Sequence, residues 1–188
     1  MKIVALGDSL MAGYQLPASA AFPAQLEKAL KAKGLNVIIA NAGVSGDTSS
    51  GGLGRLDWSV PAGTDAVVLS LGANDMLRGV DPKVTRAALE KIVRRLKDRG
   101  VEVLLAGMLA PPNLGPDYAR AFNSIFPELA KANDLLFYPF FLEGIAADPQ
   151  MNLRDGIHPS AAGVVAMVER IVPKAEELVA RVRSKRGS

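Results

Sequence analysis

The single histidine of this chain is the residue on which any imidazole chemistry must rest. His158 stands three residues after Asp155 and directly before Pro159. A carboxylate hydrogen-bonded to one imidazole nitrogen fixes the tautomer and stabilises the imidazolium, so the other nitrogen is free to accept a serine proton. On its own the pair favours a plainer interpretation, a surface histidine beside a helix cap. The other polar blocks of the sequence therefore decide between the two.

A candidate nucleophile lies near the start of the chain, in the run Gly7-Asp8-Ser9-Leu10. This run follows an apolar segment, which predicts that Ser9 occupies a strand-to-helix turn. Free backbone amides and the positive end of the helix dipole would favour negative charge on a substrate held there. The alternative is that Ser9 only caps the helix.

Two more blocks offer hydrogen-bond donors. In the run 41–48, Gly46 allows a close approach of the backbone, although Asp47 or Thr48 as an ordinary helix cap is the alternative. In the run 71–75, the amide of Asn74 can donate to an oxyanion while Asp75 fixes the loop through backbone amides. Both blocks also fit simple turns.

The elements that must position these blocks alternate between short apolar runs and longer amphipathic segments. This alternation predicts a parallel sheet in a three-layer α/β/α sandwich. The expected strands are 2–7, 35–41, 65–71, 101–108 and 134–138. The expected helices are 23–33, a segment capped by Asp81 and ended by Gly100, 118–132, and 160–182, with Pro173 predicted to kink or break the last.

Loops at the carboxyl ends of the strands form the ligand site of an open parallel sheet. Each polar block lies at a predicted junction between a strand and a helix or just before the last helix, so we expect the blocks to meet at one edge. We expect one domain over residues 1–183 and a frayed or vector-derived tail at 184–188.

Taken together, the blocks resemble the SGNH or GDSL hydrolase family. They stand in order as Gly7 to Leu10, Ser45 to Thr48, Gly72 to Asp75 and Asp155 to His158, so the resemblance spans essentially the whole chain. Further stretches are similar to the bacterial group with thioesterase I, protease I, lysophospholipase and arylesterase activities: Gly13-Tyr14, 18–23, 52–56, 77–79 and 138–141.

This resemblance implies a strand order of 2-1-3-4-5 and a serine esterase or thioesterase that needs no cofactor and no metal. Ser9 would be the nucleophile, His158 the general base and then acid, and Asp155 its orienting partner. The oxyanion donors would be the backbone amides of Ser9 and Gly46 with the side chain of Asn74. The substrate would be a small ester or thioester, including aryl esters, acyl esters, lysophospholipids or acyl-CoA.

Apolar residues near these loops are candidates for contact with the acyl group: Met11, Met76, Leu77, Leu109, Leu114 and Ile157. The alternative for each is ordinary core or loop packing. Met11 and Ala73 depart from the residues common in the family, which bears on substrate fit rather than on the chemistry.

Three other functions remain open at this stage. The nearest is a carbohydrate O-deacetylase of the same family. A flavodoxin-like binding module lacks support because the chain has no glycine-rich phosphate fingerprint and no P-loop. The third is a scaffold in which the polar blocks have no catalytic role. The nucleophile-elbow pattern G-x-S-x-G is absent, which argues against an ordinary α/β-hydrolase.

Composition excludes several classes of protein and of site. The chain has 188 residues, one His and no Cys, which excludes disulfides, cysteine nucleophiles and multi-histidine metal sites. Four C-terminal basic residues account for the net charge of +3, so no nucleic-acid footprint is expected.

No apolar run is long enough for a membrane span, and no leader is recognised at the N-terminus. Only the family resemblance suggests a periplasmic or secreted location; the oligomeric state is open.

Overall fold

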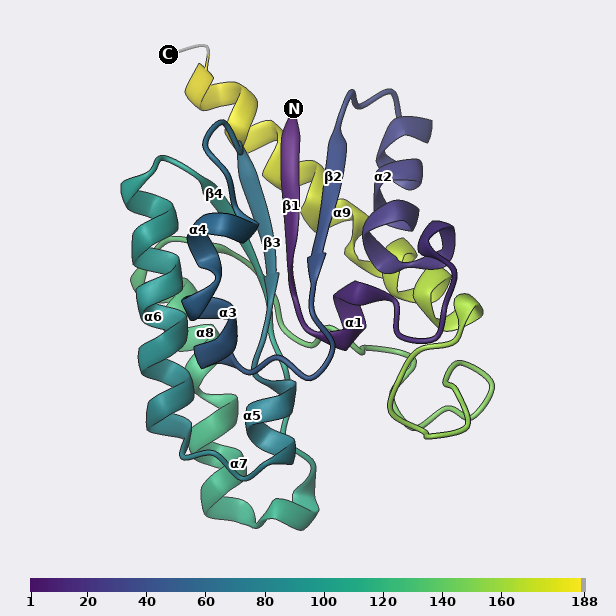
Figure 1. Cartoon of the computed structure of the whole chain (residues 1–188), viewed down its shortest axis with the longest axis vertical. Helices are drawn as coiled ribbons and strands as arrows, with labels where there is room; N and C mark the ends of the chain where they lie inside the picture. Colours follow the sequence, from purple (N-terminus) through teal and green to yellow (C-terminus); the bar gives the residue numbers. More distant parts are fainter. Residues whose placement is uncertain (187–188) are drawn as a thin grey trace.

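Apolar runs of the sequence form five parallel strands in the computed structural model, which describes residues 1–186. The strands lie in the order β2-β1-β3-β4-β5, as predicted (Figure 1). Their bounds are β1 (Lys2–Gly7), β2 (Ile38–Gly43), β3 (Ala66–Ser70), β4 (Glu102–Ala106) and β5 (Leu136–Tyr138).

Helices cover both faces of this sheet. Their bounds are α1 (Ser9–Ala12), α2 (Phe22–Ala32), α3 (Ser49–Gly54), α4 (Leu56–Ser59), α5 (Ala73–Leu77), α6 (Pro82–Asp98), α7 (Pro116–Asn123), α8 (Ile125–Ala132) and α9 (Ala161–Arg186), with short 3₁₀ turns at Ala18–Ala20 and Pro112–Leu114. Helices α2 and α9 pack together on one face, and α3, α6 and α8 lie on the other (Figure 1). The predicted three-layer sandwich is confirmed.

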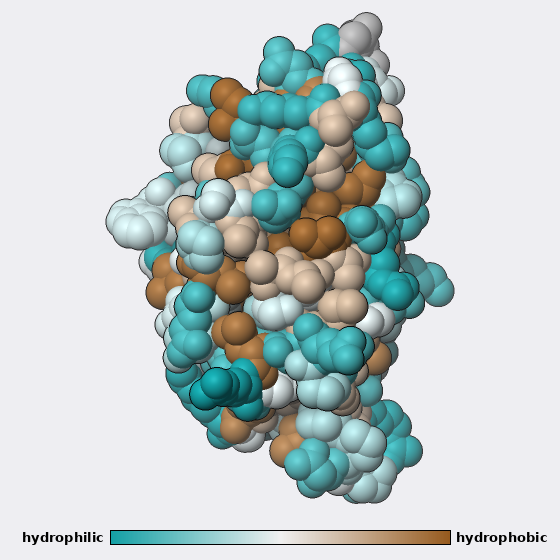
Figure 2. Space-filling model, turned by 90° about the vertical axis from the view of Figure 1, so that its right-hand side faces the viewer, coloured by the Kyte–Doolittle hydropathy of each residue, from teal (hydrophilic) through white to brown (hydrophobic). Residues whose placement is uncertain are grey.

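Burial follows the position of each strand in the sheet. Every residue of β3 is buried, because helices cover both of its faces, and this explains its continuous apolar sequence. Strand β2 lies at the edge, and its Ile38 is 60% exposed. Figure 2 shows this side of the molecule, where brown apolar residues form an uneven band bordered by teal polar ones.

The carboxyl ends of the first three strands lie level with one another. Gly7, the last residue of β1, pairs with Gly43 of β2 and Ser70 of β3. Strand β2 begins and ends later than predicted, because the expected turn at its end continues as strand. A β-carbon on Gly43 would lie 2.2 Å from the backbone nitrogen of Ala12, so only glycine lets α1 pack against this strand. The loops that follow the three strands therefore leave from one edge.

Two predicted helices differ from the structure. The expected helix 118–132 is two helices, α7 and α8, which meet at Ser124. The expected break at Pro173 is wrong, since α9 continues through it. The ring of Pro173 is exposed while its neighbours Ile171 and Val172 are buried, so tertiary packing holds the helix together.

Part of the predicted tail lies in a helix. Helix α9 includes Ser184 to Arg186, where Lys185 forms an ion pair with Glu102 and Arg186 one with Asp65. The rest of that predicted tail, residues 187–188, lies outside the described residues. Over residues 1–186, no helix combines the length and the apolar character needed to cross a bilayer.

Replacing Pro173 with alanine should stabilise the protein. The change restores a backbone donor inside α9 and removes the clash of the ring with the preceding turn, while an exposed side chain gives up little packing. We expect the free energy of unfolding to rise by about 1–3 kcal/mol in urea titrations. An unchanged or lower value would show that the helix gains nothing from a continuous hydrogen-bond ladder at this point.

Candidate active site

Three side chains from opposite ends of the sequence form a hydrogen-bonded series at the carboxyl edge of the sheet. The hydroxyl of Ser9 lies 2.9 Å from Nε2 of His158. On the other side of the ring, Nδ1 of His158 lies 2.7 Å from Oδ2 of Asp155. The structure thus brings together the residues for which the sequence predicted a nucleophile, a base and an orienting carboxylate.

The loop before α9 builds the Asp155–His158 pair from local hydrogen bonds. Oδ1 of Asp155 accepts from the backbone N–H groups of Ile157 and His158, at 2.9 and 3.0 Å. Hydrogen bonds from these two amides and from the His158 ring lower the pKa of Asp155 to about 2. An ionised carboxylate only accepts hydrogen bonds, so the proton on Nδ1 points toward Asp155 and Nε2 is left as an acceptor facing Ser9.

The side chain of Asn152 holds the start of this loop in place. Its side-chain amide is buried and donates to the carbonyl groups of Ile145 and Asp148, at 2.6 and 2.8 Å. Leu153 donates from its backbone to the carbonyl of His158, at 2.7 Å. The backbone of the loop that carries the histidine is therefore held in place, while the ring itself is held by its hydrogen bonds to Ser9 and Asp155.

Ser9 is free of the capping role that was its alternative interpretation. The residue before it, Asp8, caps α1 by accepting from the backbone N–H of Leu10 at 3.0 Å. Ser9 is the first residue of α1 and is 9% exposed, with its hydroxyl turned to His158. Because α1 is a single turn, the nearby positive charge comes from individual N–H groups rather than from a long helix dipole.

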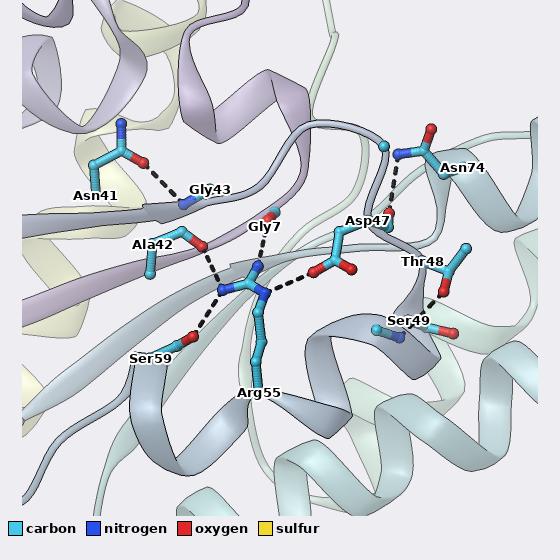
Figure 3. Close-up of polar contacts among 12 residues, drawn as sticks. Gly7, Asn41, Ala42, Gly43, Asp47, Thr48, Ser49, Arg55, Ser59 and Asn74 are labelled. Carbon is cyan, nitrogen blue, oxygen red and sulfur yellow. Dashed lines mark hydrogen bonds and ion pairs between the residues drawn. The ribbon is translucent and has the colours of Figure 1, made fainter.

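Of the two other groups predicted as donors, Gly46 lies in the loop after β2 and Asn74 lies in the first turn of α5. The side-chain nitrogen of Asn74 donates to the backbone carbonyl of Asp47, the residue after Gly46, at 2.9 Å (Figure 3). Within residues 1–186, the backbone N–H groups of Ser9 and Gly46 donate to no protein acceptor. Unpaired donors of this kind can receive a substrate oxygen.

Asp75 fixes the loop that carries Asn74, though partly through contacts other than those predicted. Its carboxylate accepts from the backbone N–H of Ser49 at 2.8 Å, as expected, and also from the hydroxyls of Ser49 and Thr85, at 2.5 and 3.1 Å. Thr48, one of the two residues suggested as a cap, is the N-cap of α3.

An apolar cavity of about 380 Å³ opens beside Ser9 and His158. Four of the residues predicted to contact an acyl group line it: Met76, Leu77, Leu109 and Ile157. Other lining residues could not be predicted from the sequence, among them Leu10, Met108, Pro111, Phe140 and Leu142. Their apolar character gave no sign of which side of the chain they face.

Two of the predicted contact residues do not line this cavity. Met11 is completely buried in the core, where its side chain lies close to Gly7. Leu114 lies in the 3₁₀ turn Pro112–Leu114 and is 37% exposed outside the cavity. Met11 is one position from the lining residue Leu10, and on a helix adjacent residues point in different directions.

The structure adds one aromatic contact that sequence reasoning did not predict. The ring of Tyr14 lies against the ring of His158, with 4.3 Å between the centroids and 34° between the planes. In the part of the chain described, no three His, Cys, Asp or Glu side chains gather as metal ligands would.

A serine, a histidine and an aspartate in hydrogen-bonded series, on a parallel sheet of order 2-1-3-4-5, define a hydrolase of the SGNH class. Residues 5–166 match the family described as GDSL-like lipase/acylhydrolase. The chain belongs to this family, which confirms the resemblance found in the sequence and with it the expected class of enzyme, a hydrolase of acyl esters.

Individual relatives agree with this assignment. The chain is 40% identical over 179 residues to an arylesterase of Vibrio mimicus, which covers 95% of this chain and 88% of that protein. It is 42% identical over 159 residues to thioesterase 1/protease 1/lysophospholipase L1 of Escherichia coli K12, with coverage of 84% and 75%. The solved structure of the psychrotrophic esterase EstA from Pseudoalteromonas sp., inhibited by monoethylphosphonate, is 28% identical and superimposes with a TM-score of 0.89, covering 95% of this chain and 98% of that one.

Asp8 gives the site a pH-dependent effect on stability. The side chain is 1% exposed, and Oδ2 has no hydrogen-bond partner among the described residues. Burial raises the pKa of Asp8 to about 6. The folded state therefore holds this proton more tightly than the unfolded chain does, and ionisation of Asp8 destabilises the fold as the pH rises from about 4 to about 6.

Asp8→Asn keeps an oxygen to accept from Leu10 and removes the charge. Relative to the wild type, the free energy of unfolding of this variant should increase between pH 4 and pH 7, by up to roughly 3 kcal/mol. Urea titrations across this range measure the difference, with the exposed Asp117→Asn as control. Parallel curves for wild type and Asp8→Asn would contradict the raised pKa.

Proposed function

We propose that Ser9, His158 and Asp155 form the catalytic triad of a serine esterase and thioesterase that works through an acyl-enzyme. The observation that carries the proposal is the continuous series of hydrogen bonds, 2.9 Å from Ser9 to His158 and 2.7 Å from His158 to Asp155. In this role Oγ of Ser9 attacks the acyl carbon while Nε2 of His158 takes the hydroxyl proton.

The imidazolium formed in that step then gives its proton to the leaving group. The tetrahedral intermediate collapses, the bond to the alcohol or thiol breaks, and the departing oxygen or sulfur receives the proton from His158. Water next attacks the acyl-Ser9 ester, with His158 again as base, and the acid is released. The ionised Asp155 stabilises the positive ring in both halves of the reaction.

The donors proposed for the oxyanion are the backbone N–H groups of Ser9 and Gly46 and the side-chain amide of Asn74. The amide of Asn74 has two hydrogens, of which one is used by the carbonyl of Asp47, so the other remains for a substrate oxygen. All three donors lie in the segments that directly follow β1, β2 and β3, so the sheet limits their reorganisation when charge develops.

The acyl group is proposed to lie in the apolar cavity beside Ser9. A volume of about 380 Å³ exceeds what an acetyl group fills, and the cavity walls carry leucine, methionine, isoleucine and phenylalanine. This favours medium acyl chains over acetate and makes the carbohydrate O-deacetylase the weaker alternative. Aryl esters, lysophospholipids and acyl-CoA share the required feature, an apolar group on an ester or thioester.

Hydrolysis of p-nitrophenyl esters from acetate to long chains tests the proposed nucleophile. Ser9→Ala should lower kcat by at least about 10⁴-fold, since the acyl-enzyme cannot form. The control is Ser19→Ala, an exposed serine far from His158 in the chain, which should retain wild-type rates. A Ser9→Ala variant that is folded and still hydrolyses these esters at a tenth of the wild-type rate or more would overturn the proposal.

The acyl-chain length profile tests the proposed cavity. Leu77→Ala should lower kcat/KM for medium-chain esters relative to acetate by about 10-fold, because the loss of apolar contact with the acyl chain costs about 1–3 kcal/mol. Leu114→Ala removes the same atoms outside the cavity and should leave the profile unchanged. Equal effects of the two variants would contradict the assignment of the cavity to the acyl group.

A further inference from the structure

Arg55 joins four separate segments next to the active site. Its guanidinium donates from Nη2 to the carbonyl of Gly7 at 2.8 Å, and from Nη1 to the carbonyl of Ala42 at 2.9 Å and the hydroxyl of Ser59 at 2.8 Å. The Nε–H donates to the carboxylate of Asp47 at 2.6 Å (Figure 3). Its side chain is 15% exposed, so solvent screens these contacts only weakly.

Two of the acceptors of Arg55 lie at strand ends that lead into the candidate active site. Gly7 is the last residue of β1 and stands two positions before Ser9. Ala42 lies at the end of β2, and the loop that follows leads to Gly46. The planar guanidinium of Arg55 thus links the ends of β1 and β2 to helix α4 and to the loop before α3.

Asp47 extends this link to the proposed oxyanion donors. Its carboxylate is held by Arg55, while its backbone carbonyl accepts from the side-chain amide of Asn74 at 2.9 Å (Figure 3). Gly46 is the preceding residue in the chain. A shift of the Asp47 carboxylate would therefore move both Gly46 and the acceptor that orients Asn74.

Gly51 leaves the space that the Asp47 carboxylate occupies. A β-carbon at residue 51 would lie 2.0 Å from Oδ1 of Asp47, so any other residue there would push the carboxylate out of its position. The backbone N–H of Gly51 also donates to the side chain of Thr48, which holds the first turn of α3 in place. The Asp47 carboxylate is thus confined from two sides, by the guanidinium of Arg55 and by Gly51 of α3.

We propose that Arg55 is a positioning residue that fixes the Asp47 loop, and through it Gly46 and Asn74, in the geometry that receives the oxyanion. The inference rests on the proposed role of Gly46 and Asn74 as oxyanion donors. Arg55 itself touches no reacting atom; its hydrogen bonds order the backbone that presents the donors. A guanidinium is suited to this task because its rigid fork carries five N–H donors on three nitrogens, whereas the ammonium of lysine has three donors on one nitrogen and cannot serve these four acceptors.

The contrasting role for Arg55 is a stability contact that ties strands and helices together without effect on the reaction. A residue of that kind would change the free energy of unfolding and leave kcat of the folded enzyme unchanged. A positioning residue lowers kcat with little change in KM, because the oxyanion exists only after the bound substrate has been attacked.

The test compares Arg55→Lys with Arg99→Lys, an arginine that donates to the backbone carbonyls of Val60 and Pro61. With a p-nitrophenyl ester, at a temperature where circular dichroism shows every variant folded, Arg55→Lys should lose about 10- to 100-fold in kcat with KM changed less than about threefold. Arg99→Lys should retain the wild-type kcat. A loss confined to stability in Arg55→Lys would overturn the inference.

A double-mutant cycle shows whether Arg55 acts through the oxyanion donors. Asn74→Ala alone should lower kcat by about 10²–10³-fold. When both changes are combined, the loss should be clearly smaller than the product of the single losses, because the second change disturbs a donor set that is already impaired. Multiplicative losses would overturn the role of Arg55, while an unchanged kcat in Asn74→Ala would overturn the oxyanion assignment and the inference together.

Gly51→Ala provides a second variant that leaves Arg55 and Asp47 chemically intact. Its added methyl group should displace the Asp47 carboxylate and produce the same signature, a lower kcat with a nearly unchanged KM. Combination with Arg55→Lys should add little further loss. If a folded Gly51→Ala enzyme keeps the full kcat, the position of the Asp47 carboxylate does not govern the oxyanion donors and the inference fails.

Discussion

The hydrogen bond between Ser9 and His158 is the constraint on which the rest of this structure depends. It joins side chains that are 149 positions apart in the chain, at 2.9 Å. Nothing local can hold such a contact. Ser9 is fixed by the end of β1 inside the sheet, and His158 by a loop that Asn152 anchors and α9 continues. A misplacement of about 1 Å can cost 10²-fold in rate. The packing of the sheet and of α9 must therefore hold the distance between Ser9 and His158 closely.

Two carboxylates stand near the same imidazole in opposite environments. Asp155 accepts three N–H groups, so its pKa falls to about 2 and it stays ionised under all ordinary conditions. Asp8 is buried with one oxygen unpaired among the described residues, so its pKa rises to about 6. Different environments thus separate the two groups: Asp155 carries a permanent charge beside the ring, whereas Asp8 titrates close to neutral pH.

Features set by local chemistry could be predicted from the sequence. The cap at Asp81 and the stop at Gly100 delimit α6 as expected, and apolar runs locate every strand. Features set by distant packing could not. The end of β2 depends on the close approach of Gly43 to α1, and the continuity of α9 at Pro173 depends on burial of the residues around it.

The same distinction applies to the candidate site. Ser9, Gly46, Asn74, Asp155 and His158 all stand in motifs; the fold joins Ser9, His158 and Asp155 by hydrogen bonds, and Gly46 and Asn74 lie in the segments that follow β2 and β3. Hydropathy did not show which way Met11 or Leu114 points, and neither of these candidates for substrate contact lines the cavity beside Ser9. Arg55 stood out only as part of the stretch 52–56, and its contacts could not be predicted, because the one with Gly7 spans 48 positions and only the fold creates it.

In the proposed reaction, Ser9 becomes covalently modified. The most direct measurement is mass spectrometry of the protein after treatment with an alkyl fluorophosphonate, in which Oγ of Ser9 bonds to phosphorus and fluoride leaves. We expect one adduct per chain, on the peptide that contains Ser9, with loss of esterase activity in proportion. An adduct on another residue that abolishes activity, or full activity after complete labelling of Ser9, would contradict this role of Ser9.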